Sequence, residues 1–116
     1  MTPETKQEFI RRQARQDRLS TEGERVLWGR HGITELVNEG WDRKLVEDAL
    51  QDGEVIEGYP TSHRPLPDCL VLSWLATGEP CHVVIGIDEA NDRVFVITVY
   101  KPSREEWEDD WRTRKQ

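Results

Sequence analysis

Residues 69–100 read CLVLSWLATGEPCHVVIGIDEANDRVFVITVY, and this stretch decides the fold. It is rich in valine, isoleucine, leucine and aromatic residues, which favour extended strands. Turn-forming residues interrupt it twice, at 77–80 and at 88–92. The pattern predicts an antiparallel β-meander of three strands, at 69–76, 81–87 and 93–100.

The two turns also predict a register for this meander. A tight turn at 78–79 places Leu75 opposite His82, and the second turn pairs Asp88 with Arg93. One face of the sheet then forms an apolar layer for helices, and the other face carries His82 among aliphatic neighbours. The side chains expected to face the helices from the first strand are Leu70, Leu72 and Trp74.

The residues before the meander have the spacing of helices instead. From Arg30 onward, apolar residues recur at helical intervals as far as Gly40, which we expect to end a helix in the left-handed conformation. Asp42 is typical of an N-cap and predicts a second helix that Gly53 ends. Short strands are predicted on either side of this helical hairpin, at 25–28 and 55–59.

Both ends of the chain are predicted to be helical. An N-cap threonine and Pro3 begin a helix over 3–18. Its apolar face is too thin for a central core helix, so we expect an arm laid on the domain or on a second copy of it. A capping box at 103–106 predicts a short final helix with Trp107 and Trp111 on one face.

These elements predict an α+β fold, an antiparallel β-meander packed against a helical hairpin. A chain of 116 residues suits one core, so we expect an N-terminal helical arm at 1–20 and a single domain at 24–111. No apolar run approaches the roughly 18 residues of a membrane span, and the N-terminal residues lack the apolar stretch of a secretory signal. We therefore expect a cytoplasmic protein with no membrane partner.

The charge of the chain is unevenly distributed. The formal net charge is −7, and residues 21–60 hold ten acidic against four basic residues, a local charge of −6. Binding of polyanions depends on lysine and arginine that neutralise phosphate. The charge pattern disfavours broad binding of nucleic acid.

The histidines and cysteines do not form a metal-binding pattern. The sequence contains no Cys-x-x-Cys pair and no His-x-x-x-His pair. Cys81 and His82 are adjacent on one predicted strand, so their side chains must point to opposite faces. We expect no metal, no other cofactor, and reduced thiols at Cys69 and Cys81.

Four residues are candidates for a functional site. His82 lies mid-sheet among apolar neighbours, where burial would hold its imidazole neutral and suited to general-base catalysis. The alternative is a structural histidine bonded to a backbone group or an acid, and His31, at a helix start, has the same two interpretations. Arg64, in a loop with three prolines at 60–67, is either a phosphate clamp or a solvated side chain. Tyr100, at the end of the last strand, either reaches a cleft or packs on a tryptophan.

Several segments, taken in order, resemble domain-of-unknown-function family 4258. They are RHG at 30–32, GEVIEGYP at 53–60, PCHVV at 80–84 and VITVYKP at 96–102, and the likeness covers roughly residues 26–107. Families of this pattern are similar to the RelE and BrnT toxin superfamily. The resemblance implies a β-α-α-β-β-β-β fold and a metal-independent ribonuclease of the mRNA interferase type.

The resemblance also implies a bacterial toxin–antitoxin pair, with an antitoxin protein as the partner. Relatives tend to carry arginine at the positions that Glu35 and Glu39 occupy here. The site residues that the resemblance favours are His31, Arg64, His82 and Tyr100.

The sequence supports a second hypothesis as well, a noncatalytic protein-interaction module or an inactive member of that fold. On this hypothesis the N-terminal helix, or the face of Trp107 and Trp111, forms a protein interface such as that of a homodimer. The net charge of −7 agrees with this hypothesis better than with RNA binding.

Overall fold

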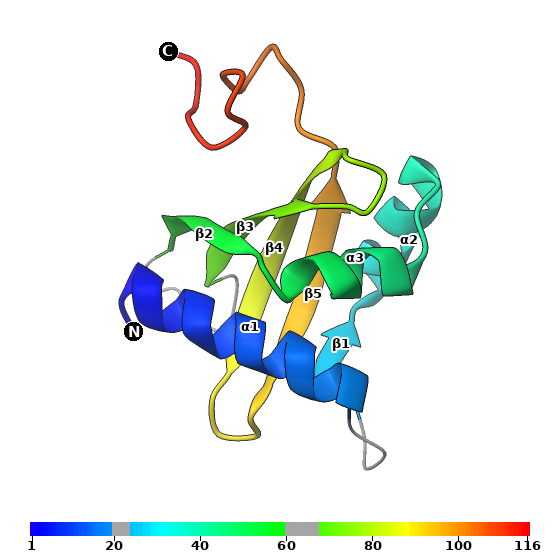
Figure 1. The fold of residues 1–116 in the computed structure, drawn as a ribbon, viewed down its shortest axis with the longest axis vertical. Coiled ribbons are helices and arrows are strands. Elements are labelled where there is room, and N and C mark those ends of the chain that lie inside the picture. Colours follow the sequence, from blue (N-terminus) through cyan, green and yellow to red (C-terminus); the bar gives the residue numbers. More distant parts are fainter. Residues whose placement is uncertain (20–23, 60–67) are drawn as a thin grey trace.

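The computed structural model describes residues 1–19, 24–59 and 68–116, and these form an α+β fold of three helices and five strands (Figure 1). The predicted class is therefore confirmed. The elements, in chain order, are α1 (Pro3–Leu19), β1 (Val26–Trp28), α2 (Arg30–Glu39), α3 (Arg43–Leu50), β2 (Glu54–Gly58), β3 (Cys69–Trp74), β4 (Pro80–Asp88) and β5 (Arg93–Tyr100).

The five strands form one mixed sheet in the order β1-β5-β4-β3-β2. Strands β3 to β5 form the antiparallel meander that the sequence predicts, and β2 adds a fourth strand that is antiparallel to β3. The first strand lies at the edge and pairs in parallel with β5, with Val26 opposite Val94. The short strand predicted at 25–28 is therefore present, and it makes the sheet mixed.

The predicted register between β3 and β4 is wrong by three positions. His82 lies opposite Leu72 instead of Leu75, because the connection is a five-residue loop in which the Leu75 amide donates to the Glu79 carbonyl at 2.9 Å. Because side chains alternate between the two faces of a strand, a shift by an odd number of residues moves each side chain of β3 to the face opposite the predicted one. Val71 joins the core beneath the helices, whereas Leu70 and Leu72 face the opposite side.

The register between β4 and β5 agrees with the prediction near their turn, where Asp88 lies opposite Arg93. A bulge then intervenes, because Val84 pairs with Thr98 and Ile85 with Val96. The extra residue on β5 moves the partner of His82 to Tyr100. An imidazole and a phenol thereby become direct cross-strand neighbours.

The first helix lies across one face of the sheet together with α3, and we call this the helix face (Figure 1). Its apolar stripe is thin, as predicted, yet Phe9, Ile10 and Ala14 are buried in the main core. Polar contacts extend the packing, since the buried Lys6 ammonium donates to the Asp68 carbonyl at 2.8 Å. Of the two placements predicted for this helix, the structure has it on its own domain and within the core.

The helical hairpin has the predicted ends. Gly40 adopts φ 74° at the end of α2, and the Asp42 carboxylate accepts from the Leu45 amide at 2.8 Å at the start of α3. The second helix lies against β5, and a Cβ added at Gly32 would come within 2.9 Å of the Val96 carbonyl oxygen. This close approach fixes the position of α2 on the sheet.

The prediction of a short C-terminal helix is wrong. Residues 101–116 form turns and one isolated bridge between Trp107 and Arg114. The Asp110 carboxylate accepts from the amides of Arg112 and Thr113, both at 3.0 Å, and Trp111 takes φ 61°. These side-chain hydrogen bonds compete with a helix and replace it by a tight turn.

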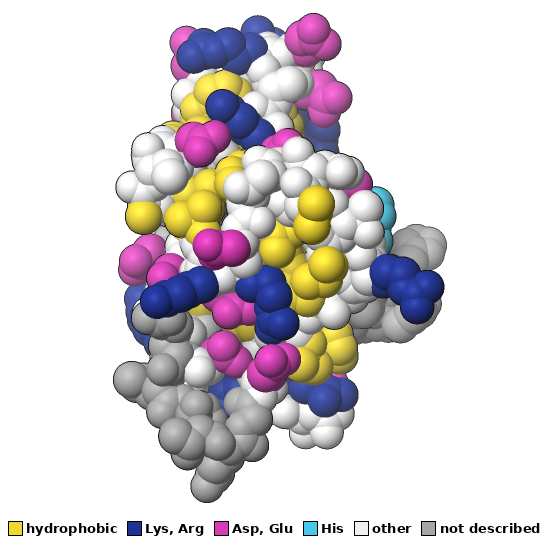
Figure 2. Space-filling view, turned by 90° about the vertical axis from the view of Figure 1, so that its right-hand side faces the viewer, with side chains coloured by type: hydrophobic (Ala, Val, Ile, Leu, Met, Phe, Trp, Pro, Cys, Tyr) yellow, Lys and Arg dark blue, Asp and Glu magenta, His cyan; other side chains and the backbone are white. Residues whose placement is uncertain are grey.

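The surface on the side of α2 and α3 carries acidic and basic side chains interspersed, with apolar side chains between them (Figure 2). Val37 of α2 is the most exposed large apolar residue in the described part of the chain, with 71% of its surface accessible. No continuous basic field that could hold a polyanion is visible on this face. Among the described residues, no helix combines the length and the apolar character needed to cross a membrane.

Candidate functional site

The face of the sheet opposite α1 and α3 carries a second, smaller cluster of buried side chains, and we call it the tail face. Leu70, Leu72 and His82 on this face are each at most 1% exposed. Trp107 lies against His82 and is itself 1% exposed. It belongs to residues 103–116, here called the C-terminal segment, which lies at the end of the molecule where β5 finishes (Figure 1).

His82 is enclosed, and both of its ring nitrogens have partners. Nε2 lies 2.7 Å from the carbonyl oxygen of Trp111, which can only accept, so Nε2 carries the proton and donates it. Nδ1 of the neutral ring then accepts from the Tyr100 hydroxyl at 3.2 Å. The Trp107 ring stands edge-on to the imidazole, with 4.4 Å between the ring centroids. The geometry fixes one tautomer.

Burial determines the charge of this histidine. Desolvation lowers the pKa of His82 below its ordinary value of 6.5, although the hydrogen bond to the Trp111 carbonyl and the charge of Glu57 act in the opposite direction. The same cause raises the pKa of the adjacent Tyr100 hydroxyl. At neutral pH the pair therefore consists of an uncharged imidazole and an uncharged phenol.

A carboxylate and a second phenol lie beside this pair. Glu57 of β2 accepts from the Tyr59 hydroxyl at 3.1 Å and from Arg114 of the C-terminal segment at 2.5 and 3.1 Å. The hydrogen bond from Arg114 lowers the pKa of Glu57, and burial raises the pKa of Tyr59 to about 12. The tail face thus gathers carboxylate, imidazole, two phenols and a guanidinium, all groups used in proton transfer or anion binding.

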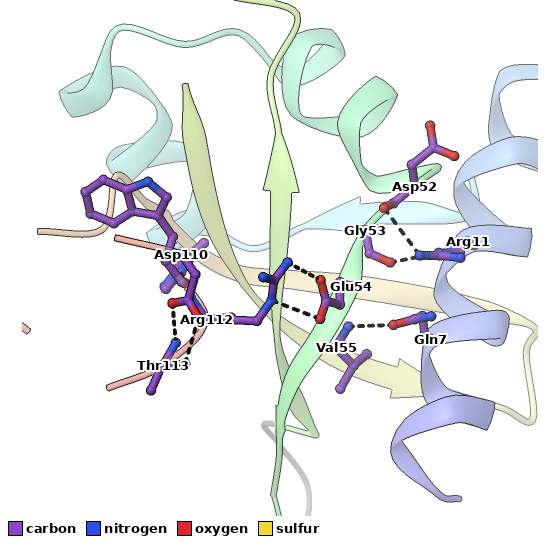
Figure 3. A network of polar contacts seen from close by, with 11 residues as sticks. Gln7, Arg11, Asp52, Gly53, Glu54, Val55, Asp110, Arg112 and Thr113 are labelled. Atoms are coloured by element: carbon purple, nitrogen blue, oxygen red, sulfur yellow. Dashed lines mark hydrogen bonds and ion pairs between the residues drawn. The ribbon is translucent and has the colours of Figure 1, made fainter. Parts of the chain in front are cut away.

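The second strand is held from both sides (Figure 3). On one side, the Gln7 side chain of α1 accepts from the Val55 amide at 3.0 Å. On the other, Arg112 of the C-terminal segment donates to both oxygens of Glu54, at 2.9 and 3.2 Å. The helix protects the outer edge of the sheet, and the segment spans the tail face up to the same strand.

A family model described as Domain of unknown function (DUF4258) matches residues 28–101. The chain belongs to this family. The match confirms the resemblance found in the sequence, over a slightly shorter range. Comparison with curated proteins and comparison with solved structures each returned no match.

The DUF4258 match includes the polar groups of the tail face but not the groups that cover them. It contains Glu57, His82 and Tyr100 and ends one residue after the last strand. Helix α1 and the C-terminal segment both lie outside it. In this chain, the sheet of the family domain is therefore enclosed on its tail face by residues that the family model does not match.

The structure brings together two of the four candidate residues. His82 and Tyr100 are hydrogen-bonded neighbours, as described above. His31 lies exposed in the first turn of α2 and has no hydrogen bond or ion pair with the described residues. Arg64 lies outside the residues that the structure describes.

Three residues of the cluster were not singled out from the sequence. Glu57 lies in β2 and Tyr59 directly follows that strand, and their spacing of two residues indicates that they share a face. No sequence signal indicates that Arg114 reaches the sheet, and the helix predicted for the C-terminal residues gives no reason to expect it there. The Glu39 carboxylate accepts from the Lys101 amide at 2.6 Å, just after the end of β5.

The two cysteines lie away from this cluster. Both are buried free thiols, and Cys81 points into the helix-face core while its neighbour His82 points to the tail face. Burial raises the pKa of Cys69 to about 12 and also raises the pKa of Cys81. Among the described residues there is no group of three or more histidine, cysteine or acidic side chains with the geometry of a metal site.

Proposed function

We propose that this DUF4258 chain is a RelE/BrnT-like toxin-superfamily protein with a metal-independent ribonuclease site on its tail face. The element order from β1 to β5, one strand, two helices and four strands, agrees with that superfamily and supports the proposal. The observation that carries it is the convergence of Glu57, His82 and Tyr100, from three different strands, on one face of the sheet. Acid–base catalysis requires a base within hydrogen-bonding reach of the proton that it removes, and His82 Nδ1 already accepts from the Tyr100 hydroxyl at 3.2 Å.

In this proposal His82 is the general base. Its neutral ring takes the proton from a ribose 2′-hydroxyl, the 2′ oxygen attacks the adjacent phosphorus, and the bond from phosphorus to the 5′ oxygen breaks. The leaving oxygen takes a proton from water, and the hydroxide so formed takes back the proton on the ring. The products are a 2′,3′-cyclic phosphate and a 5′-hydroxyl. Tyr100 positions the sugar or the base.

The negative charge that develops on the phosphate in the transition state also requires a nearby cation. Arg64 is the residue that we propose for holding the scissile phosphate, and an antitoxin protein is the proposed partner that controls the activity. Glu57, which faces the same site, carries negative charge and opposes the approach of RNA. The proposed substrate is therefore a flexible single strand that can bring one phosphate to the sheet, not an extended duplex.

The test is cleavage of RNA by the purified full-length protein, with and without ribosomes. We expect wild-type cleavage to exceed that of His82→Asn by about a hundredfold or more, the usual contribution of a general base. His31→Asn is the matched control, because His31 is exposed and outside the cluster, and it should cleave like wild type. Wild-type cleavage no faster than that of His82→Asn would remove the proposal.

A second candidate, a noncatalytic interaction module, is favoured by a different observation. His82 is 0% exposed, and both ring nitrogens are already hydrogen-bonded, as in a structural histidine. Its proposed interface is a homodimer through the N-terminal helix or through the face of Trp107 and Trp111. Because Phe9, Ile10 and Trp107 are buried within the chain, such a dimer would use the polar sides of these segments or exchange the segments between copies.

Light scattering on the full-length chain distinguishes this candidate. A dimer mass, together with no RNA cleavage by wild type, would favour the interaction module. A monomer mass over the whole accessible concentration range would count against the homodimer.

A further inference from the structure

We propose that the C-terminal segment, residues 103–116, is a detachable cover that leaves the tail face while the helix face stays folded. In the closed state it keeps His82 buried and is bound to Glu57 through Arg114. Opening itself is a property of the fold and does not depend on any activity. Only the use of the opened face by RNA rests on the proposed function.

Within the described part of the chain, the segment supplies the groups that separate His82 from solvent. The ring lies on an outer face of the sheet, yet it is 0% exposed. Its closest enclosing groups from outside the sheet are the Trp107 ring and the Trp111 carbonyl, and both belong to the segment. Detachment of residues 103–116 would therefore open the imidazole to water and to reagents.

Few polar contacts attach the segment to the rest of the protein. Within the described residues, every hydrogen bond from the segment to the remainder of the chain goes to Glu54, Glu57 or His82. The two arginine pairs are solvent-exposed, with 44% and 54% of the Arg112 and Arg114 side chains accessible. Exposed ion pairs of this kind change a population by only about 1.4- to 5.4-fold each.

The closed state also contains two unfavourable features, and both belong to the segment. The Trp107 indole Nε1 is buried with no hydrogen-bond partner among the described residues. Trp111 has φ 61°, in the left-handed region that side chains other than glycine rarely adopt. Both features disappear when the segment detaches, so they favour opening without weakening the sheet.

The main core does not depend on the cover. The hydrophobic core cluster contains Val83, Ile85 and Val96 with their helix partners, but it does not include Trp107. The match to DUF4258 likewise ends before the segment begins. Local opening is common for elements with few buried side chains, and Trp107 is the one buried side chain among residues 103–116.

The two faces of β4 give a direct test of opening, because they carry different reactive groups. Diethyl pyrocarbonate modifies neutral imidazole, and His82 is accessible to it only when the segment is detached. The buried thiols of Cys69 and Cys81 lie beneath the helices and react with N-ethylmaleimide only when the helix face opens. Peptide mass analysis separates His82 from the other two histidines of the chain.

The variant is full-length Arg112→Ala/Arg114→Ala, which removes both attachments to β2. The matched control is Arg104→Ala, because the ion pair of Arg104 with Asp109 and its contact with the Trp111 ring both lie inside the segment. In wild type we expect His82 to react while both thiols stay protected. In the double variant the His82 rate should rise by about two- to thirtyfold, and in Arg104→Ala it should stay within about twofold of wild type.

Joint labelling of His82 and the thiols at one rate in wild type would overturn the proposal, since it would mean that only global unfolding exposes the ring. An unchanged His82 rate in the double variant would overturn it as well. RNA cleavage, measured on the same samples, separates the two proposals. Faster His82 labelling without RNA cleavage would support the detachable cover and contradict the ribonuclease proposal. RNA cleavage with an unchanged His82 labelling rate would support the ribonuclease proposal and contradict the detachable cover.

Discussion

The helix face and the tail face of the sheet are both buried, but they are buried by different means. On the helix face, regular helices place side chains such as Ile10 and Val46 against an almost wholly apolar layer. On the tail face, an irregular segment covers a mixed apolar and polar cluster with the buried Trp107 ring, and exposed ion pairs attach the segment to β2. Apolar burial scales with area and is hard to reverse, whereas exposed ion pairs contribute little. The comparison indicates that stability resides on one face and reactivity on the other.

The largest effect that this comparison predicts is on the helix face. Ile85→Ala should lower the free energy of unfolding by about 2–5 kcal/mol, because truncating this fully buried side chain leaves a cavity in the core. Denaturant unfolding followed by circular dichroism measures the loss. Trp74→Ala, at a position that is 51% exposed on the same sheet, serves as control and should lose much less. An equal loss for the two variants would contradict the assignment of the main core.

The second prediction concerns the close contact between Gly32 of α2 and strand β5, which leaves no room for a side chain. Gly32→Ala would place a Cβ 2.9 Å from the Val96 carbonyl, and we expect it to lower the free energy of unfolding by about 1–3 kcal/mol. Gly29→Ala is the matched control, because its nearest neighbour is the same oxygen at 3.9 Å. If the two variants unfold at the same denaturant concentration, α2 is not held as closely as described.

Protonation of His82 on the tail face should make the free energy of unfolding depend on pH. The folded pKa of His82 is below 6.5, so in the window below 6.5 the unfolded chain binds a proton that the folded chain does not. The stability from the neutral ring is therefore complete above pH 6.5 and is lost as the pH falls toward the folded pKa. The charged groups facing the ring are Glu57, which raises its pKa, and Arg114, which lowers it.

Unfolding midpoints of wild type and His82→Asn, measured at about pH 7.5 and about pH 5.5, test this dependence. We expect the wild type to lose more stability on acidification than the variant loses. A variant with the same pH dependence as wild type would show that another group is responsible.

The smallest effect should come from a single attachment of the segment. Arg112→Ala removes one exposed pair with Glu54 and should lower the free energy of unfolding by only about 0.2–1 kcal/mol. The loss should shrink in high salt, which screens exposed charges. Thermal unfolding at low and high ionic strength measures both quantities. A loss as large as that of Ile85→Ala would mean that the tail face is part of the main core.

Much of the fold could be predicted from the sequence, because local rules decide it. Gly40 ends α2 in the left-handed conformation, and Asp42 caps α3, as their residue types require. Two non-local features could not be predicted. The five-residue loop after β3 changed the register by an odd number, and the bulge in β5 moved Tyr100 opposite His82. Turn length and bulges depend on tertiary packing, which periodicity does not report.

The candidate site was predicted in part for the same reason. His82 is a candidate because it lies mid-sheet among apolar neighbours, and Tyr100 because it ends the last strand, whereas their direct pairing comes from the bulge in β5. The groups that cover them were missed, because a capping box favoured a helix over 103–111. The Asp110 carboxylate holds the amides of Arg112 and Thr113 instead, and the resulting turn brings Arg114 to Glu57. A side chain that bonds to its own backbone can override helical spacing.

The parallel pairing of β1 with β5 has a consequence for the order of assembly. Every other neighbouring pair in the sheet joins strands that are consecutive along the chain, whereas Val26 must meet Val94. The first strand therefore has no docking site until the last strand of the meander has been laid down. Bringing such distant segments together carries a larger chain-entropy penalty than closing a hairpin does. The earliest strand in the sequence is thus the one whose place in the sheet is completed latest.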